Sequence, residues 1–197
     1  VGDNESYTKY LVKLVADANM NIKSQSMSLE KHILTGNQKV LANNAAMGDT
    51  VNYCLESRLS EMDGYDTYTF IVHDELDAGL TFNNDVAVKI GANENNPSSI
   101  TVEYAMQKDG NYSSELPTIE KGQKLYIHIK LNGLTRQYKN QLVSITYSAT
   151  VNEKANIGNT PNNNVAYLEY SNNPNASQPN GSASTTETPK TTVSTYV

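Results

Sequence analysis

The sequence of 197 residues is poor in cysteine and in the larger aromatic residues of hydrophobic cores: it holds one cysteine, no tryptophan and two phenylalanines. A single Cys54 excludes an intramolecular disulfide framework and a four-cysteine zinc site. No apolar run approaches about 18 residues, so we expect no membrane span. The formal net charge is −6, and no clustered Lys/Arg face accompanies it, which argues against a nucleic-acid-binding protein.

Catalytic signatures are also missing, since the sequence has no GxSxG, P-loop, HExxH or GxGxxG motif. The three histidines, His32, His73 and His128, are scattered singly, each beside an apolar strand face. We therefore predict solvated strand positions for them rather than metal ligands. We expect no metal, no cofactor and no enzyme that turns over an external substrate.

What the sequence has in excess is asparagine, with 25 residues, and asparagine favours turns over helices. Between the turns, apolar residues alternate with period two, which is typical of half-buried strands. Eight short strands of this kind, without helical or βαβ patterns, predict an all-β sandwich. The predicted inward faces are Leu29/Lys31/Ile33, Val51/Tyr53/Leu55, Phe70/Val72/Asp74/Leu76, Val86/Val88/Ile90, Ile100/Val102/Tyr104, Leu125/Ile127/Ile129, Val143/Ile145/Tyr147 and Leu168/Tyr170/Asn172.

Both ends of the chain differ from this pattern. Residues 1–26 are expected to form a connector or the tail of a preceding domain, with a strand at Tyr7–Ala16. The sandwich domain is expected to cover residues 27–175. Residues 176–197 are rich in Pro, Gly, Ser and Thr, which is typical of an extended linker. Their last part, Thr192–Val197, has strand character and could open a following domain.

Three polar residues interrupt the predicted apolar faces. Lys31 lies between Leu29 and Ile33, Asp74 lies between Val72 and Leu76, and Asn172 follows Leu168 and Tyr170. Burial of an unpaired charge costs several kcal/mol. One interpretation is that the side chains reach solvent at strand ends, or that Lys31 and Asp74 form a buried salt bridge.

The other interpretation is covalent. Burial lowers the pKa of a lysine and raises that of a carboxyl group, so both become neutral. A neutral Lys31 amine is a nucleophile, the Asn172 amide is an electrophile, and a protonated Asp74 can polarise that amide and shuttle protons. Contact inside a fold supplies the effective concentration that an unreactive amide needs. The product would be a Lys–Asn isopeptide bond with loss of ammonia.

A family resemblance strengthens the covalent interpretation. Five segments, in order, resemble the second domain of Gram-positive fimbrial backbone subunits, the domain of that family in which an isopeptide bond forms. Together they run from about Ser28 to Asn175, and the final YSNNPN is the most specific. The segments are Glu30–Leu34 (EKHIL), Met47–Tyr53 (MGDTVNY), His73–Phe82 (HDELDAGLTF), Ser144–Val151 (SITYSATV) and Tyr167–Asn175 (YLEYSNNPN).

The resemblance implies an Ig-like sandwich with a self-catalysed isopeptide bond. Carried over to this sequence, Lys31 is the amine donor, Asp74 the catalytic acid and Asn172 the acceptor, with Asn173 as the alternative acceptor. Some relatives use a glutamate as the acid, so Glu103 and Glu153 stay open for the role given to Asp74. An aspartate acid and a long separation between Lys31 and the acceptor favour the CnaA-like variant, whose bond joins opposite sheets, over the CnaB-like variant.

The resemblance also implies a biological setting: a structural domain of a sortase-assembled pilus on the outer surface of a Gram-positive cell, anchored to the cell wall and supporting adhesion. Its partners would be other pilin subunits, linked through segments outside these residues, because the sequence shows neither an LPxTG-type sorting motif nor a YPKN lysine motif. The alternative is an adhesin module that binds a host glycan or extracellular matrix through loops such as Asn93–Ser99 or Asp109–Ser114.

Overall fold

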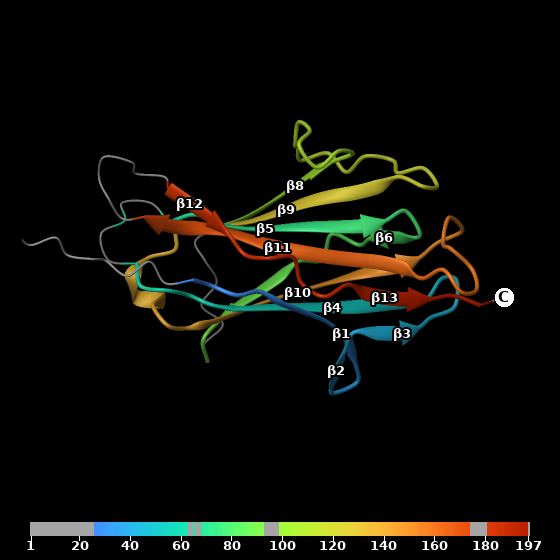
Figure 1. The fold of residues 1–197 in the computed structure, drawn as a ribbon, viewed down its shortest axis with the longest axis horizontal. Coiled ribbons are helices and arrows are strands. Elements are labelled where there is room, and N and C mark those ends of the chain that lie inside the picture. Colours follow the sequence, from blue (N-terminus) through green and yellow to red (C-terminus); the bar gives the residue numbers. More distant parts are fainter. Residues whose placement is uncertain (1–25, 63–64, 66–67, 93–98, 174–180, 197) are drawn as a thin grey trace, which may run out of the picture.

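The chain forms two β-sheets packed face to face in a computed structural model (Figure 1), which describes residues 26–62, 65, 68–92, 99–173 and 181–196. The first sheet has the order β2-β1-β4-β10-β6, with β7 also pairing with β10. Its strands are β1 (Glu30–Thr35), β2 (Gln38–Val40), β4 (Thr50–Arg58), β6 (Leu80–Phe82), β7 (Ala87–Ile90) and β10 (Leu142–Val151).

The second sheet has the order β3-β13-β11-β5-β9-β8, with β12 pairing with β11. Apart from a short 3₁₀ turn, η1 (Arg136–Tyr138), the described residues outside the sheets are loops and turns. The strands of this sheet are β3 (Ala42–Asn44), β5 (Phe70–Asp77), β8 (Ser99–Ala105), β9 (Lys124–Asn132), β11 (Asn162–Asn173), β12 (Gly181–Ser184) and β13 (Thr191–Ser194).

The all-β sandwich predicted from alternation is confirmed. The faces predicted to point inward supply the core between the sheets: Ile33, Leu55, Val72, Ile127 and Ile145, for example, are all buried. Alternation succeeds here because each strand has one face on the core and one toward solvent.

The sequence analysis missed the beginning of β11. This strand starts at Asn162, in a run of three asparagines that composition assigns to a turn, because asparagine is depleted in strands. Asn162 and Asn164 point inward and are buried, and Asn163 binds the carboxylate of Asp77 through both its backbone and its side-chain N–H groups. Side-chain hydrogen bonds therefore hold an asparagine run in an extended conformation.

The C-terminal residues also differ from the expectation of a linker and a following domain. The strand at Thr191–Ser194 exists, but it pairs antiparallel with β11 and parallel with β3 inside the same sheet. Before this strand, the backbone N–H of Thr185 donates to the carbonyl of Leu168, and that of Thr188 donates to the carbonyl of Ala166. These hydrogen bonds cover the edge of β11. Backbone pairing needs no large apolar side chains, so composition could not reveal it. The predicted strand at Tyr7–Ala16 lies outside the described residues.

Val193 tests whether the C-terminal strand is part of this domain. Its side chain is fully buried in the core, so Val193→Ala should lower the free energy of unfolding by about 1–3 kcal/mol through lost burial and a residual cavity. Thr192→Ala, at the neighbouring half-exposed position, is the matched control and should change it by less than about 0.5 kcal/mol. Urea unfolding measures both. Equal, small effects would contradict the placement of β13 in the core.

Candidate functional site

A lysine and an aspartate meet in the core between the two sheets. Lys31 is the second residue of β1 in the first sheet, and Asp74 lies in the middle of β5 in the second sheet. The residues are 1% and 2% exposed, and Lys31 Nζ lies 2.5 Å from Asp74 Oδ2. The sequence analysis expected these two residues to share the core, and the structure brings them into direct contact as an ion pair.

Tyr147, on β10, joins this pair through its hydroxyl group. Its Oη accepts a hydrogen bond from Lys31 Nζ at 2.8 Å and donates one to Asp74 Oδ2 at 2.8 Å. Its ring stacks on Tyr53 of the adjacent strand β4, with a centroid separation of 5.2 Å. Sequence reasoning placed both tyrosines on inward faces but gave neither a role at the site.

The fourth member of the cluster is Asn164, on β11. Its side chain is fully buried, and its Nδ2 donates a hydrogen bond of 2.6 Å to Tyr147 Oη. In the strand register, Asn164 pairs with Leu76 and Ala166 pairs with Asp74, so Asn164 is two residues along β11 from the position beside the acid. The site is therefore a quartet of Lys31, Asp74, Tyr147 and Asn164.

Three buried oxygens of this region have no hydrogen-bond partner among the described residues: Asp74 Oδ1, Asn164 Oδ1 and the Tyr53 hydroxyl. A buried oxygen without a partner costs about 1–3 kcal/mol. A proton on the Asp74 carboxyl would convert one of these acceptors into a donor, as polarisation of an amide oxygen requires.

Burial decides the electrostatics of the site. It lowers the pKa of Lys31 from 10.5 to about 8, although the charge and hydrogen bond of Asp74 oppose this. Burial also raises the pKa of Tyr147 well above 10 and raises that of Tyr53. A lysine with a pKa near 8 has a substantial neutral fraction at mildly alkaline pH, while the phenols keep their protons.

The predicted acceptor Asn172 does not join the quartet. It lies at half-buried depth near the end of β11, six residues beyond Ala166, the partner of Asp74. At about 3.3 Å per residue it is about 20 Å from the acid, too far to reach Lys31. Asn173 is one residue further along, and its side chain lies outside the described part of the chain. Strand parity with Leu168 and Tyr170 favours Asn172, but Asn164 has the same parity.

The alternative acids lie away from the core. Glu103 on β8 points outward and binds Lys130 Nζ at 2.6 Å, and Glu153 is exposed in the turn after β10.

Cys54 is buried on the opposite side of β4 from Tyr53, and its Sγ lies 3.6 Å from the Ser144 hydroxyl. Desolvation raises its pKa, which disfavours the thiolate.

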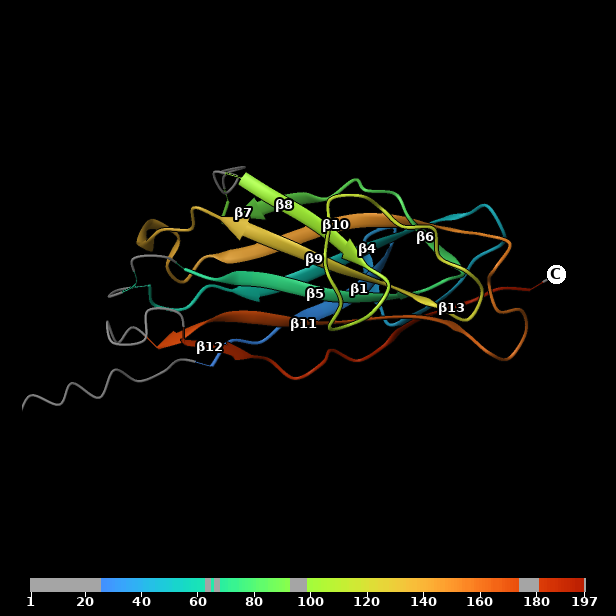
Figure 2. The ribbon, with the colours of Figure 1, turned by 90° about the horizontal axis from the view of Figure 1, so that it is seen from above.

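A second cluster lies on the outer face of the second sheet. His73 and His128 face each other across β5 and β9, with a ring separation of 4.1 Å. His73 stacks on Tyr167 of β11, and Tyr112, from the loop after β8, stacks on His128; Figure 2 shows this loop lying over the sheet. The expectation of solvated histidines needs correction, because aromatic packing leaves both rings half-buried.

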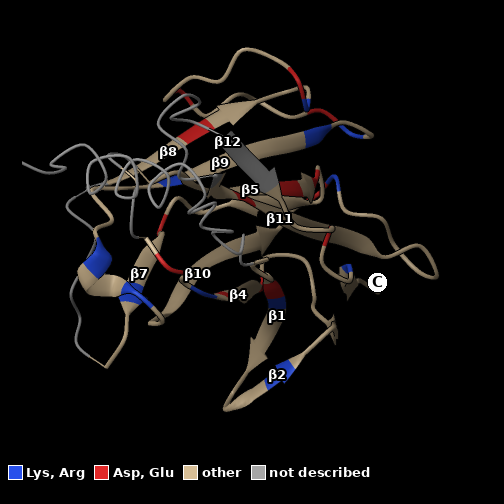
Figure 3. Ribbon diagram, turned by 60° about the vertical axis from the view of Figure 1, so that its left-hand side comes forward, with Lys and Arg blue, Asp and Glu red and all other residues tan. Residues whose placement is uncertain are grey.

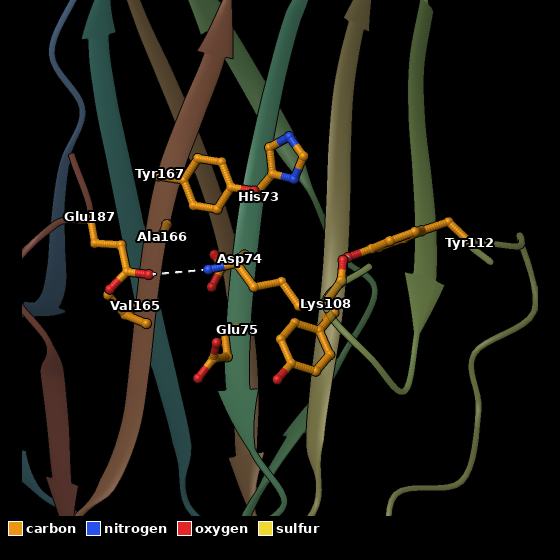
Figure 4. Close-up of a pocket in the computed structure, with 10 residues that line it drawn as sticks. His73, Asp74, Glu75, Lys108, Tyr112, Val165, Ala166, Tyr167 and Glu187 are labelled. Atoms are coloured by element: carbon orange, nitrogen blue, oxygen red, sulfur yellow. Dashed lines mark hydrogen bonds and ion pairs between the residues drawn. The ribbon is translucent and has the colours of Figure 1, made fainter. Parts of the chain in front are cut away.

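The small hollow beside this cluster offers little room for a ligand. Figure 4 shows it between Tyr167 and the loop that carries Lys108, where an ion pair with Glu187 crosses it. Its cavity volume of about 10 Å³ holds about one water molecule.

Positively and negatively charged residues both occur on the two sheets (Figure 3), and several of them form ion pairs. Examples are Lys39 with Glu56, Lys130 with Glu103, and Lys139 with Glu61. Within the described ranges, no group of three or more His, Cys, Asp and Glu residues is arranged to hold a metal ion. None of the helices in the described part of the chain is long and apolar enough to cross a membrane.

No protein-family model matches the sequence, and a search of curated proteins gives no match. The fold, however, matches solved structures of pilins. Against BcpA, the major pilin subunit of Bacillus cereus, the TM-score is 0.59 at 18% identity, over 86% of this chain and 40% of that chain. Against a 35 kDa C-terminal fragment of the major pilin GBS80 of Streptococcus agalactiae, the TM-score is 0.59 at 19% identity, over 86% of this chain and 56% of that chain.

The full-length major pilin SpaD from Corynebacterium diphtheriae gives a TM-score of 0.56 at 20% identity, over 84% of this chain and 34% of that chain. These neighbours are Gram-positive major pilins, the class that the sequence resembles. The likeness establishes the fold. The chain spans between about a third and somewhat more than half of the length of these three neighbours.

The histidine cluster predicts a pH dependence of stability. Burial lowers the pKa of His128 from 6.5 to about 4, and the charges of His73 and Lys130 add to this. As the pH falls below 6.5, the unfolded chain takes up this proton and the folded chain does not, so stability must fall. We expect the urea midpoint of unfolding of the wild-type chain to decrease from pH 6.5 to pH 5. In the His128→Gln variant, the urea midpoint should decrease less over the same pH range. His32→Gln, on β1, is the matched control and should leave the slope as in wild type; equal slopes for both variants would refute the prediction.

Proposed function

We propose that the chain is a structural domain of a pilus backbone protein, stabilised by a self-catalysed isopeptide bond between Lys31 and Asn164. The buried quartet is the observation that carries this proposal. It places an amine, a carboxyl and a carboxamide together in a water-free core, which is the set of groups that the covalent chemistry requires. The pilin-like fold and the resemblance of the five sequence segments support a pilus backbone domain with such a bond. The resemblance implied Asn172 as the acceptor, and the choice of Asn164 rests on the quartet alone.

The reaction begins with proton transfer within the ion pair. The Lys31 ammonium gives a proton to Asp74 across their 2.5 Å contact, which leaves a neutral amine and a neutral acid; burial favours the neutral amine of Lys31. Lys31 Nζ then attacks Asn164 Cγ while Asp74 donates a hydrogen bond to the amide oxygen. Loss of ammonia completes an amide bond between the two side chains. The fold supplies the proximity that makes an ordinary carboxamide reactive.

The bond would tie the two sheets together. Lys31 belongs to β1 of the first sheet and Asn164 to β11 of the second, so this geometry favours the CnaA-like variant. A cross-link that closes a loop of more than 100 residues removes unfolded-state entropy worth about 4–5 kcal/mol, by analogy with a disulfide. It needs no cysteine and no oxidising compartment, which suits a chain with one buried cysteine.

A pilus backbone explains why such a domain would be useful. A shaft subunit works under tension and outside the cell, where a covalent tie across the core resists unfolding. Sortase assembly, anchoring to the cell wall and linkage to other pilin subunits would depend on segments outside these residues. The domain would catalyse one turnover on itself and act on no external substrate.

Intact-mass spectrometry of the purified chain tests the bond. The wild-type chain should be lighter than its sequence mass by one ammonia. Asp74→Ala should restore the full mass, because removal of the acid leaves the amide unpolarised. Asn164→Ala should also abolish the loss of ammonia, since it removes the leaving group.

The matched control is Asn172→Ala, which removes an asparagine from the same strand outside the quartet. This variant should lose ammonia like wild type. Loss of the mass change in Asn172→Ala but not in Asn164→Ala would return the acceptor role to Asn172. A wild-type chain of full mass would refute the isopeptide bond and leave a buried salt bridge in its place.

A further inference from the structure

The hydroxyl of Tyr147 lies at the centre of the quartet, and the proposed reaction gives it no role. It is the only group in the described quartet that contacts the other three members: Lys31 Nζ at 2.8 Å, Asp74 Oδ2 at 2.8 Å and Asn164 Nδ2 at 2.6 Å. Nδ2 is the nitrogen that must leave as ammonia. The acid therefore reaches the leaving nitrogen through the phenol in this hydrogen-bond network.

We infer that Tyr147 is a catalytic residue for isopeptide formation, relaying a proton from Asp74 to the departing nitrogen of Asn164. The inference rests on the proposed function, and it assigns the step that converts an amide nitrogen into a leaving group.

The hydrogen bonds first point in the unreactive direction. An amide nitrogen has no basic lone pair, so Asn164 Nδ2 can only donate to Tyr147 Oη, and Tyr147 in turn donates to Asp74. When the carbonyl carbon becomes tetrahedral, Nδ2 becomes an amine that can accept a proton. The same heavy-atom contacts then permit the reverse direction, from Asp74 through the phenol to Nδ2.

The proton and electron balance is complete. On attack, the Nζ–Cγ bond forms and the C=O π pair moves to Asn164 Oδ1, which takes the carboxyl proton of Asp74. Asp74 Oδ2 next removes one proton from Nζ. Tyr147 then gives its proton to Nδ2 and takes the one held by Asp74.

The Cγ–Nδ2 bond breaks and its electron pair leaves with ammonia, while the hydroxyl proton of the intermediate returns to Asp74 and the C=O bond reforms. The phenol ends as it began, and Asp74 ends as the protonated acid that entered the attack step. Ammonia can accept that proton and leave as ammonium, which returns Asp74 to a carboxylate. Because burial keeps the pKa of Tyr147 well above 10, the phenol keeps a proton until this step.

The neighbouring Tyr53 provides a control of the same chemistry. Tyr53 and Tyr147 are directly paired across β4 and β10, and their rings stack. Both are buried. Asn164 also affects the pKa of Tyr53, but the Tyr53 hydroxyl makes no hydrogen bond that would connect it to Asp74 among the described residues. Replacement of either tyrosine by phenylalanine removes one oxygen from the same layer of the core, and only Tyr147→Phe breaks the relay.

The test follows bond formation in the full chain during cell-free synthesis, with samples quenched in acid denaturant and the loss of ammonia read by intact mass. Tyr147→Phe should form the bond about 100-fold more slowly than wild type, which is within the usual contribution of a general acid. Tyr53→Phe should stay within about twofold of wild type on the same scale. If wild type forms the bond and Tyr147→Phe keeps pace with Tyr53→Phe, the relay is refuted while the proposed function stands. If wild type never loses ammonia, the proposed function itself fails.

A second variant covers the case in which Tyr147→Phe does not fold. Site-specific 3-fluorotyrosine at position 147 keeps the hydroxyl and the packing but makes the phenol more acidic. A proton donor of greater acidity should raise the rate of bond formation by about twofold or more. An unchanged rate in this variant would overturn the relay, because the rate of proton transfer from the phenol must respond to the acidity of the phenol.

Discussion

The contact between Lys31 and Asp74 is the constraint on which the interior of this protein depends. It joins the two sheets at 2.5 Å in a layer without solvent, where two charges are costly to hold and where loss of one partner leaves the other uncompensated. Tyr147 and Asn164 extend the contact into a connected polar network inside an otherwise apolar core. An ion pair alone would be a poor source of stability at this depth. A covalent product would remove both the lysine charge and the cost of desolvating that charge. For this reason we regard the network as a reaction site and not as a buried salt bridge.

The same network explains the unusual composition. A sandwich with one cysteine and no tryptophan lacks the common means of tying two sheets together, and a Lys–Asn bond would supply one from ordinary residues. The aromatic residues around it, Tyr53 and Tyr147, exclude water and keep their own protons because burial raises their pKa values. In the proposed reaction the core provides the low dielectric that favours a neutral Lys31, and Tyr147 is the proton donor to the amide leaving group.

Alternation predicted most of the fold, because each long strand has one buried face and one exposed face; Ile33, Val72 and Ile145 are examples. It also found Lys31 and Asp74, since a charge on an apolar face is visible in the sequence. The proposed acceptor was harder to find, because Asn164 lies in an asparagine run that local propensity assigns to a turn. The role proposed for it rests on register with β5 and on side-chain hydrogen bonds, which are tertiary contacts. The place of the C-terminal strands in this sheet was not predicted for a related reason: the strand expected at Thr192–Val197 pairs with β11 and β3 through backbone groups, and composition carries no record of that pairing.

A crystal structure of the wild-type chain would test the central claim most directly. The account predicts continuous electron density from Lys31 Nζ to Asn164 Cγ at the length of an amide bond, about 1.33 Å, with the Tyr147 hydroxyl beside the new bond. Separate side chains at hydrogen-bonding distance, or density that joins Lys31 to any other residue, would contradict it.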